Sequence, residues 1–173
     1  MLRRVRVQDL ALLIRLRTSE DTQAQLMAPQ FSTSVISALA WICRSVSSKK
    51  RLLRIISLSG WKPGIGFLMI FSPETPGHPP MVGIAITPDQ QGKGFGAIAM
   101  VEAIQLLRNM GFSRIRLSVR LDNPRAKNLY ESLGFTTVSR GTHTNFQGTY
   151  LSETMELHLE NWNGTIIQGA VAS

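Results

Sequence analysis

The sequence predicts a single mixed α/β domain, with a central β-sheet flanked by helices, and three observations lead to this prediction. The chain has 173 residues, 43% of them hydrophobic and 17% charged, which suits one domain with its own core. Residues 114–120 alternate strictly between apolar and polar side chains, as a half-buried strand does. Residues 81–86 are continuously apolar and lead through a glycine-rich loop into a long helical pattern. We therefore place the domain at residues 1–160 and treat residues 161–173 as a C-terminal tail.

The N-terminal part is expected to contain a short strand and two helices. Residues 2–7 alternate between apolar and basic side chains, which is typical of a strand. Asp9 is a typical N-cap residue for a helix that runs to Arg17. A second helix is expected over residues 34–46, with an apolar stripe of Val35, Leu39, Ile42 and Cys43. On this face Cys43 would be a buried structural thiol.

The middle of the chain has β character. We expect strands at residues 54–58, 65–71 and 81–86. A glycine-containing turn at residues 60–64 separates the first two, and a loop with four prolines at residues 72–80 precedes the third. Because residues 81–86 carry no polar side chain, this strand is expected to be buried on both faces.

Two helices and three strands complete the domain. A helix over residues 97–110 is ended by Gly111, and the strand at 114–120 follows. Asn123 is an N-cap residue, Pro124 occupies the first helical position, and Gly134 stands just past the end of the next helix. The last strands are expected at residues 135–139 and 153–159, around a polar loop at 141–148.

The segment between the strand at 81–86 and the following helix carries the clearest chemical signal. Gly92, Gly94 and Gly96 stand at alternate positions there, beside Lys93. Glycines allow close approach of a ligand to backbone N–H groups, and a helix N-terminus adds unpaired donors and partial positive charge. The pattern therefore predicts an anion site for phosphate or pyrophosphate. No Walker Gly-Lys-Ser/Thr sequence is present, and the region where a dinucleotide fold needs an acidic residue is basic.

At these residues the sequence resembles the GNAT superfamily of N-acetyltransferases. The family's acetyl-CoA loop has Gln or Arg, two residues, Gly, one residue, then Gly or Ala, and Gln91-Gly92-Lys93-Gly94-Phe95-Gly96 is similar to it. A second family segment, from Asn123 to Phe135, follows at the right distance. The resemblance covers residues 65–159 well and implies the GNAT fold, with acetyl-CoA as co-substrate.

The resemblance also implies roles for individual residues. Backbone groups of Ile84 and Ile86 would pair with the pantetheine arm. Asn123 would bond the pantetheine or the substrate side of the cleft, Lys127 would belong to the CoA-binding set, and Tyr130 would contact the CoA sulfur and protonate the leaving thiolate as general acid. The pyrophosphate would be held by the N–H groups of Gln91, Gly92, Lys93, Gly94, Phe95, Gly96 and Ala97.

The implied reaction is direct attack of a neutral primary amine on the acetyl thioester in a ternary complex. A backbone N–H of the strand at 81–86 would stabilise the oxyanion. Many relatives carry a glutamate five residues before the loop proline, but here that position is Gly83. Glu74 and His78 are nearby in the sequence, yet each is more simply a solvated loop residue, so the general base stays unassigned. The acceptor is left open between a peptide or protein N-terminus and a small-molecule amine.

Composition limits the partners. The formal charge of +8 suits phosphate-bearing or acidic partners, although we do not expect nucleic acid among them. The single cysteine excludes an internal disulfide, and no metal site is expected. No segment is long and apolar enough for a signal peptide or a membrane span, so we expect a cytoplasmic protein with no membrane partner. Exposed sheet edges permit a homodimer.

Two alternatives remain. One is a non-catalytic acyl-CoA-binding regulatory module of the same fold, which the glycine at position 83 would fit. The other is a nucleotide-dependent enzyme or a basic nucleic-acid binder that uses the glycine loop for other phosphates.

Overall fold

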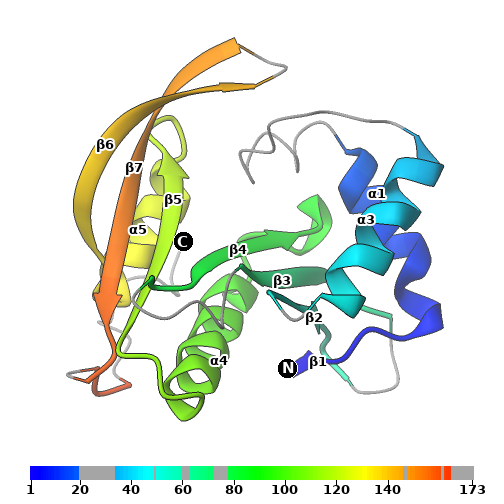
Figure 1. The fold of residues 1–173 in the computed structure, drawn as a ribbon, viewed down its shortest axis with the longest axis horizontal. Coiled ribbons are helices and arrows are strands. Elements are labelled where there is room, and N and C mark those ends of the chain that lie inside the picture. Colours follow the sequence, from blue (N-terminus) through cyan, green and yellow to red (C-terminus); the bar gives the residue numbers. More distant parts are fainter. Residues whose placement is uncertain are drawn as a thin grey trace.

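The computed structural model describes residues 1–19, 34–48, 50–59, 63–71, 78–145, 148–160 and 162–164. Seven strands form one mixed sheet in the order β1-β2-β3-β4-β5-β7-β6 (Figure 1), which confirms the predicted fold class. The elements in chain order are β1 (Leu2–Arg3), η1 (Val7–Asp9), α1 (Leu10–Thr18), α3 (Val35–Ser47), β2 (Arg51–Ile56), β3 (Gly66–Phe71), β4 (Met81–Ile86), η2 (Pro88–Gln90), α4 (Phe95–Asn109), β5 (Arg114–Arg120), α5 (Pro124–Ser132), β6 (Thr136–Asn145) and β7 (Gly148–His158). None of these described helices is long and apolar enough to cross a membrane.

Helices cover both faces of the sheet. On β3, Phe67 and Met69 pack with α1 and α3, whereas Leu68 and Ile70 pack in the larger cluster with α4 and α5. This alternation shows why the run at 66–71 is apolar throughout: successive side chains of a strand point to opposite faces, and here both faces are buried. Strand β4 was expected to be buried on both faces, but only Val82 and Ala85 are fully buried and its other residues are half-buried. Ile84 and Ile86 remain partly accessible because they line an opening beside the strand.

That opening arises where β4 and β5 diverge. They are the one parallel pair of the sheet, with a single register pair, Met81↔Arg116, and a hydrogen bond of 2.9 Å from Arg116 N to Pro80 O. Every other neighbouring pair is antiparallel. Figure 1 shows β4 and β5 running in different directions beyond their first residues. Among the described strands, the carboxyl half of β4 therefore has β3 on one side and no neighbour on the other.

Asp9 has a different role from the one predicted. It directly precedes α1, but its side chain makes no capping bond to the helix. The carboxylate is fully buried and accepts hydrogen bonds from the Arg3 guanidinium (2.6 Å twice), Arg6 N (2.9 Å) and Gly64 N (3.3 Å). Burial acts to raise the pKa of Asp9, but these donors lower it overall. Asp9 thus joins β1 and the segment before β3 to the start of α1.

Helix α3 begins at Val35, one residue after the predicted start, with Ser34 as its N-cap, and of the predicted apolar stripe only Ile42 is buried. Val35 and Leu39 are 51% and 39% exposed, and Cys43 is exposed rather than a buried thiol. The buried positions are Ala38, Ile42 and Ser45. The helix is apolar around most of its circumference, so periodicity alone could not choose the buried face. Its packing on the sheet made that choice, with Trp41 edge-on to Phe67 at 5.5 Å.

The C-terminal half follows the predictions more closely, with one correction. Strand β5 and the α5 cap at Asn123 are as predicted, and α4 begins two residues earlier than expected. The predicted polar loop at 141–148 is wrong, since β6 and β7 continue as a paired ribbon through Asn145 and Gly148. Most side chains of this ribbon end are polar and exposed, and the aliphatic Leu151 is itself 58% exposed. The ribbon end therefore shows no hydrophobic alternation, although its backbone still forms the hydrogen-bonded ladder. Trp162 is buried in the main core, which extends ordered packing just past residue 160.

Candidate functional site

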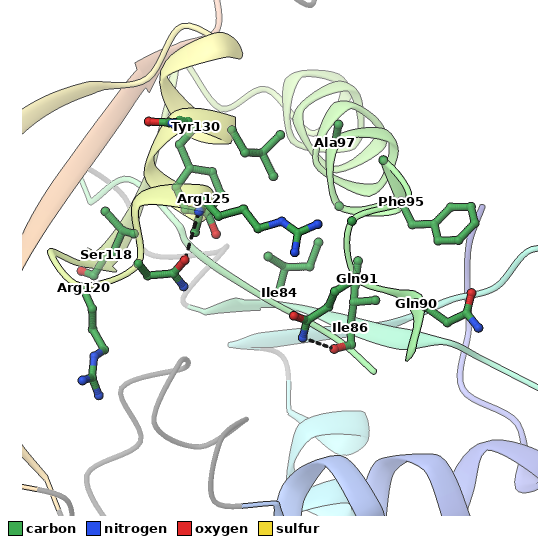
Figure 2. Close-up of a pocket in the computed structure, with 18 residues that line it drawn as sticks. Ile84, Ile86, Gln90, Gln91, Phe95, Ala97, Ser118, Arg120, Arg125 and Tyr130 are labelled. Atoms are coloured by element: carbon green, nitrogen blue, oxygen red, sulfur yellow. Dashed lines mark hydrogen bonds between the residues drawn. The ribbon is translucent and has the colours of Figure 1, made fainter. Parts of the chain in front are cut away.

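A pocket of about 300 Å³ lies where β4 and β5 diverge, between the N-terminal end of α4 and one side of α5 (Figure 2). Ten of the predicted site residues line it: Ile84, Ile86, Gln91, Gly92, Gly94, Phe95, Gly96, Ala97, Asn123 and Tyr130. The structure thus brings together two sequence segments that are separated by a helix and a strand. Lys93 and Lys127, which were also predicted, are not among the lining residues.

The backbone of Ile84 and Ile86 faces this pocket. In an antiparallel pair, residues alternate between those that exchange hydrogen bonds with the partner strand and those that do not. Thr87 N donates to Ile65 O at 2.9 Å, so in the β3–β4 register odd-numbered β4 residues pair with β3. Ile84 and Ile86 therefore direct their N–H and C=O groups toward the side where β5 has diverged. The Ile86 carbonyl accepts a 3.0 Å hydrogen bond from Gln91 Nε2, which ties the loop to the strand.

The loop and the start of α4 form a set of backbone donors. Gly92 and Gly94 have φ of 82° and 78°, a region that L side chains rarely adopt. The first intrahelical bond of α4 runs from Ile98 N to Gly94 O at 3.2 Å, so the amides of Phe95, Gly96 and Ala97 precede it. No side chain caps this end. Unpaired N–H groups at a helix N-terminus attract anions, which supports the predicted anion site.

Helix α5 forms the opposite wall. Asn123 caps it, with Oδ1 accepting from Ala126 N at 3.1 Å. Tyr130 is 8% exposed, and its ring centroid lies 5.9 Å from that of Phe135. Burial raises the pKa of Tyr130 to about 12. The phenol is therefore protonated at every physiological pH.

Arg125 is a pocket residue that the sequence analysis did not assign. Its side chain extends from α5 toward the loop (Figure 2), so that a Cβ added at Gly92 would stand 2.5 Å from Nη2 of Arg125. The guanidinium thus faces the backbone donors across the pocket. The position of Arg125, two residues after the N-cap Asn123, could have indicated that its side chain lies at the pocket, because the first turn of α5 faces the glycine loop.

The two predicted lysines have other partners. Lys93 Nζ lies 3.3 Å from Gln90 Oε1. Lys127 Nζ lies 2.9 Å from Oε2 of the buried Glu153. Lys127 is thus engaged outside the pocket lining, whereas the partner of Lys93, Gln90, lines the pocket.

The described pocket lining contains no carboxylate and no imidazole. Gly83 has no side chain to supply one, and His78 is exposed and does not line the pocket. Glu74 lies outside the described residues. Nor do the described residues contain a group of three His, Cys, Asp or Glu side chains that could hold a metal ion.

Comparisons with known proteins point to one family. Residues 60–135 match the family model described as the acetyltransferase (GNAT) family. Mycothiol acetyltransferase of Rhodococcus jostii is 30% identical over 117 residues, which are 57% of this chain and 38% of that protein. Mycothiol acetyltransferase of Renibacterium salmoninarum is 46% identical over 52 residues, 30% of this chain and 15% of that protein. The chain spans between 15% and 38% of the length of the curated relatives that it matches.

Solved structures share the whole fold. Spermidine N-acetyltransferase from Vibrio cholerae, in complex with CoA and spermine, superposes with a TM-score of 0.83 at 18% identity, covering 94% of this chain and 96% of that one. A GNAT-family acetyltransferase from Bacillus anthracis gives 0.77 at 13% identity, covering 92% and 95%. At these identities the likeness establishes the fold alone. With the glycine loop, the diverging strands and the matched family model, it leads to one conclusion: residues 60–135 of the chain match the GNAT acetyltransferase family, and the chain has the fold of a GNAT-family acetyltransferase structure.

Proposed function

We propose that the protein is an acetyl-CoA-dependent N-acetyltransferase that transfers an acetyl group to a primary amine by direct attack in a ternary complex. The observation that carries the proposal is the backbone edge of β4 at Ile84 and Ile86, which faces the pocket beside an anion site. A pantetheine arm has amides that can pair with a strand edge, and it is joined to a pyrophosphate. The pocket offers complementary groups to both parts.

Phosphate binding is assigned to the loop and to Arg125. The Gln91 N–H already donates to Pro88 O at 3.3 Å, so the N–H groups from Gly92 to Ala97 supply the neutral donors. The helix start adds partial positive charge. Arg125 adds a guanidinium from the facing wall, with planar geometry suited to phosphate oxygens. Gly92 keeps space for this side chain, since any Cβ there would collide with it.

The pantetheine arm is assigned to β4. In β-augmentation an extended ligand adds to a strand edge through backbone hydrogen bonds. The Ile86 carbonyl already accepts from Gln91, so the Ile86 N–H and both Ile84 groups are the proposed contacts. Asn123, whose Oδ1 caps α5, has its amide nitrogen for the pantetheine or the substrate side. A backbone N–H of β4 is the proposed oxyanion donor.

Tyr130 is assigned the acid role at the leaving sulfur. Its pKa of about 12 keeps the phenol protonated. A free thiol has a pKa of about 8.5, so the phenol is the weaker acid of the two. The acid role therefore takes the form of a hydrogen bond that strengthens as negative charge develops on the sulfur.

The acceptor amine is proposed to react in its neutral form. Because the described lining supplies no carboxylate or imidazole, the fraction of neutral amine should set the rate below the pKa of the amine. The chemical class of acceptor is a peptide or protein N-terminus or a small-molecule amine. The same lack of a base at Gly83 supports a second candidate, a non-catalytic acyl-CoA-binding regulatory module.

Thermal unfolding with acetyl-CoA, CoA, NAD and ATP in parallel tests the ligand. A ligand at about 100 times its Kd adds about 2.7 kcal/mol, or about 5–11 °C for a domain of this size. We expect this shift with CoA ligands only, reduced in Arg125→Gln. Arg51→Gln removes the same charge from β2, away from the pocket, and should bind like wild type. No CoA shift, or a larger one with NAD or ATP, would overturn the proposed ligand.

Turnover separates the two candidates. Thiol release from acetyl-CoA is followed with a panel of small amines and peptides with free N-termini. Release that depends on an amine, and acetylated product by mass spectrometry, supports the enzyme. Tight acetyl-CoA binding with no release on any member of the panel supports the regulatory module.

A further inference from the structure

Glu153 is a buried carboxylate that the proposed chemistry does not use. Its side chain on β7 is 0% exposed. It accepts hydrogen bonds from Lys127 Nζ (2.9 Å), Thr137 Oγ1 (3.0 Å) and Arg140 Nε (2.9 Å). The bond from Lys127 contributes most to lowering the pKa of Glu153, against the effect of burial. The carboxylate is therefore ionised at neutral pH, inside a network of cationic and hydroxyl donors.

A β-bulge in β6 makes this network geometrically feasible. The register passes from Thr137↔Met155 to Ser139↔Thr154, and Arg140 then stands opposite Glu153. In a regular strand Thr137 and Arg140, three residues apart, would point to opposite faces. The extra residue, Val138, shifts the alternation so that both side chains reach the same carboxylate.

The network reaches the pocket through α5. Among the described residues, Lys127–Glu153 is the ion pair that joins α5 to the sheet; the other pair of Lys127, with Glu131 at 3.9 Å, stays within the helix. Helix α5 also carries Arg125 and Tyr130, both pocket-lining. Its apolar contacts are non-directional and tolerate small shifts along the sheet, whereas a charge-assisted hydrogen bond fixes one position.

We propose that Glu153 is a positioning residue: through Lys127 it fixes α5 on the sheet and so places Arg125 and Tyr130 at the pocket. The roles of Arg125 and Tyr130 rest on the proposed function. Lys127 is then the internal partner of Glu153, and the basic residue of α5 that meets CoA is Arg125. A displacement of about 1 Å in such a site can cost about 100-fold in rate.

The test compares Glu153→Gln with a matched control, Glu156→Gln. Glu156 is also a buried carboxylate of β7, but its partners Arg116 and Arg114 are on β5, so it does not touch α5. Hydrogen exchange of the α5 amides, in the protein without ligand, measures directly how firmly the Lys127–Glu153 ion pair holds α5. The acetyl-CoA Kd, together with kcat and KM, measures the effect of this ion pair on the pocket. We expect Glu153→Gln to speed exchange of the α5 amides by about 10-fold or more relative to those of α4, and to weaken kcat/KM by about 10- to 100-fold. Glu156→Gln should do neither.

Lys127 variants complete the test and do not depend on Glu153→Gln folding. Lys127→Met should reproduce the loss, and Lys127→Arg should recover most of it. In the Glu153→Gln background, Lys127→Met should cause little further loss of acetyl-CoA affinity, because the pair acts as one unit. A further loss as large as that in the wild-type background would mean that Lys127 binds CoA itself, and would overturn the proposal.

Two other outcomes overturn it. One is unchanged α5 exchange and Kd in Glu153→Gln; the other is equal losses in Glu153→Gln and Glu156→Gln, which indicate general destabilisation. If wild-type protein binds no acetyl-CoA, the proposed function fails. The exchange data still decide whether Glu153 holds α5.

Discussion

Replacing Gly92 by alanine should separate backbone strain from ligand contact at the pocket. Gly92 and Gly111 have nearly equal φ angles of 82° and 85°. A left-handed conformation costs a residue with a Cβ about 1–2 kcal/mol, and each kcal/mol lowers Tm by about 2–4 °C in a domain of this size. Both alanine variants should therefore unfold about 2–8 °C below wild type. Gly111→Ala is the matched control, because nothing lies within 4 Å of its added Cβ.

Only Gly92→Ala should weaken acetyl-CoA binding. Its Cβ would stand 2.5 Å from Nη2 of Arg125, so the guanidinium must move out of its place over the loop. A hydrogen bond to a charged group is worth about 1.5–3 kcal/mol, which corresponds to about 10- to 150-fold in Kd. Calorimetric titration of both variants and of Arg125→Gln measures this.

Normal acetyl-CoA binding by these variants would contradict the reasoning. If Gly92→Ala loses stability like Gly111→Ala but binds acetyl-CoA within twofold of wild type, the position of the Arg125 guanidinium over the loop does not contribute to binding. If Arg125→Gln also binds normally, the assigned phosphate site is wrong altogether.

Three further predictions follow from the same geometry. Tyr130→Phe should lower kcat by about 100-fold or more and leave the Kd of acetyl-CoA within about twofold, measured by steady-state kinetics and titration; an unchanged kcat would remove Tyr130 from the chemistry. With a good amine acceptor, kcat/KM should rise with pH up to the pKa of the amine and show no descending limb from Tyr130 below pH 11, because its pKa is about 12; a limb near pH 8–9 that Tyr130→Phe abolishes would contradict this. Stability should fall in acid: the pKa values of Asp9, Glu153 and Glu156 are lowered from 3.8, 4.5 and 4.5, so as pH drops the unfolded chain takes up protons first. Melting curves from pH 7 to pH 2 should show Tm constant above about pH 5 and declining below it, and a Tm that rises in acid would refute the assignment.

Local signals in the sequence were enough for much of the fold. The alternation at 114–120 and the cap at Asn123 each lie within one element and are determined by neighbouring residues, and β5 and α5 occur where they were predicted. The glycine spacing at 92, 94 and 96 likewise predicted a loop of backbone donors at a helix start. The predictions were wrong where the side-chain pattern did not distinguish a buried face from an exposed one. The outer ribbon of β6 and β7 has mostly polar side chains, and α3 is apolar on most of its circumference.

The sequence by itself determined that a strand, a glycine loop and a helix would stand in order, and that the family segment from Asn123 to Phe135 would follow. Only the tertiary structure decided which charged side chain of α5 faces the loop. Arg125 and Lys127 are both basic and two residues apart, but helical geometry directs them about 200° apart. The fold then places the buried carboxylate of Glu153 beside Lys127 and the glycine loop beside Arg125. The buried face of a helix and the partner of a charge depend on residues distant in sequence, so no local pattern contains them.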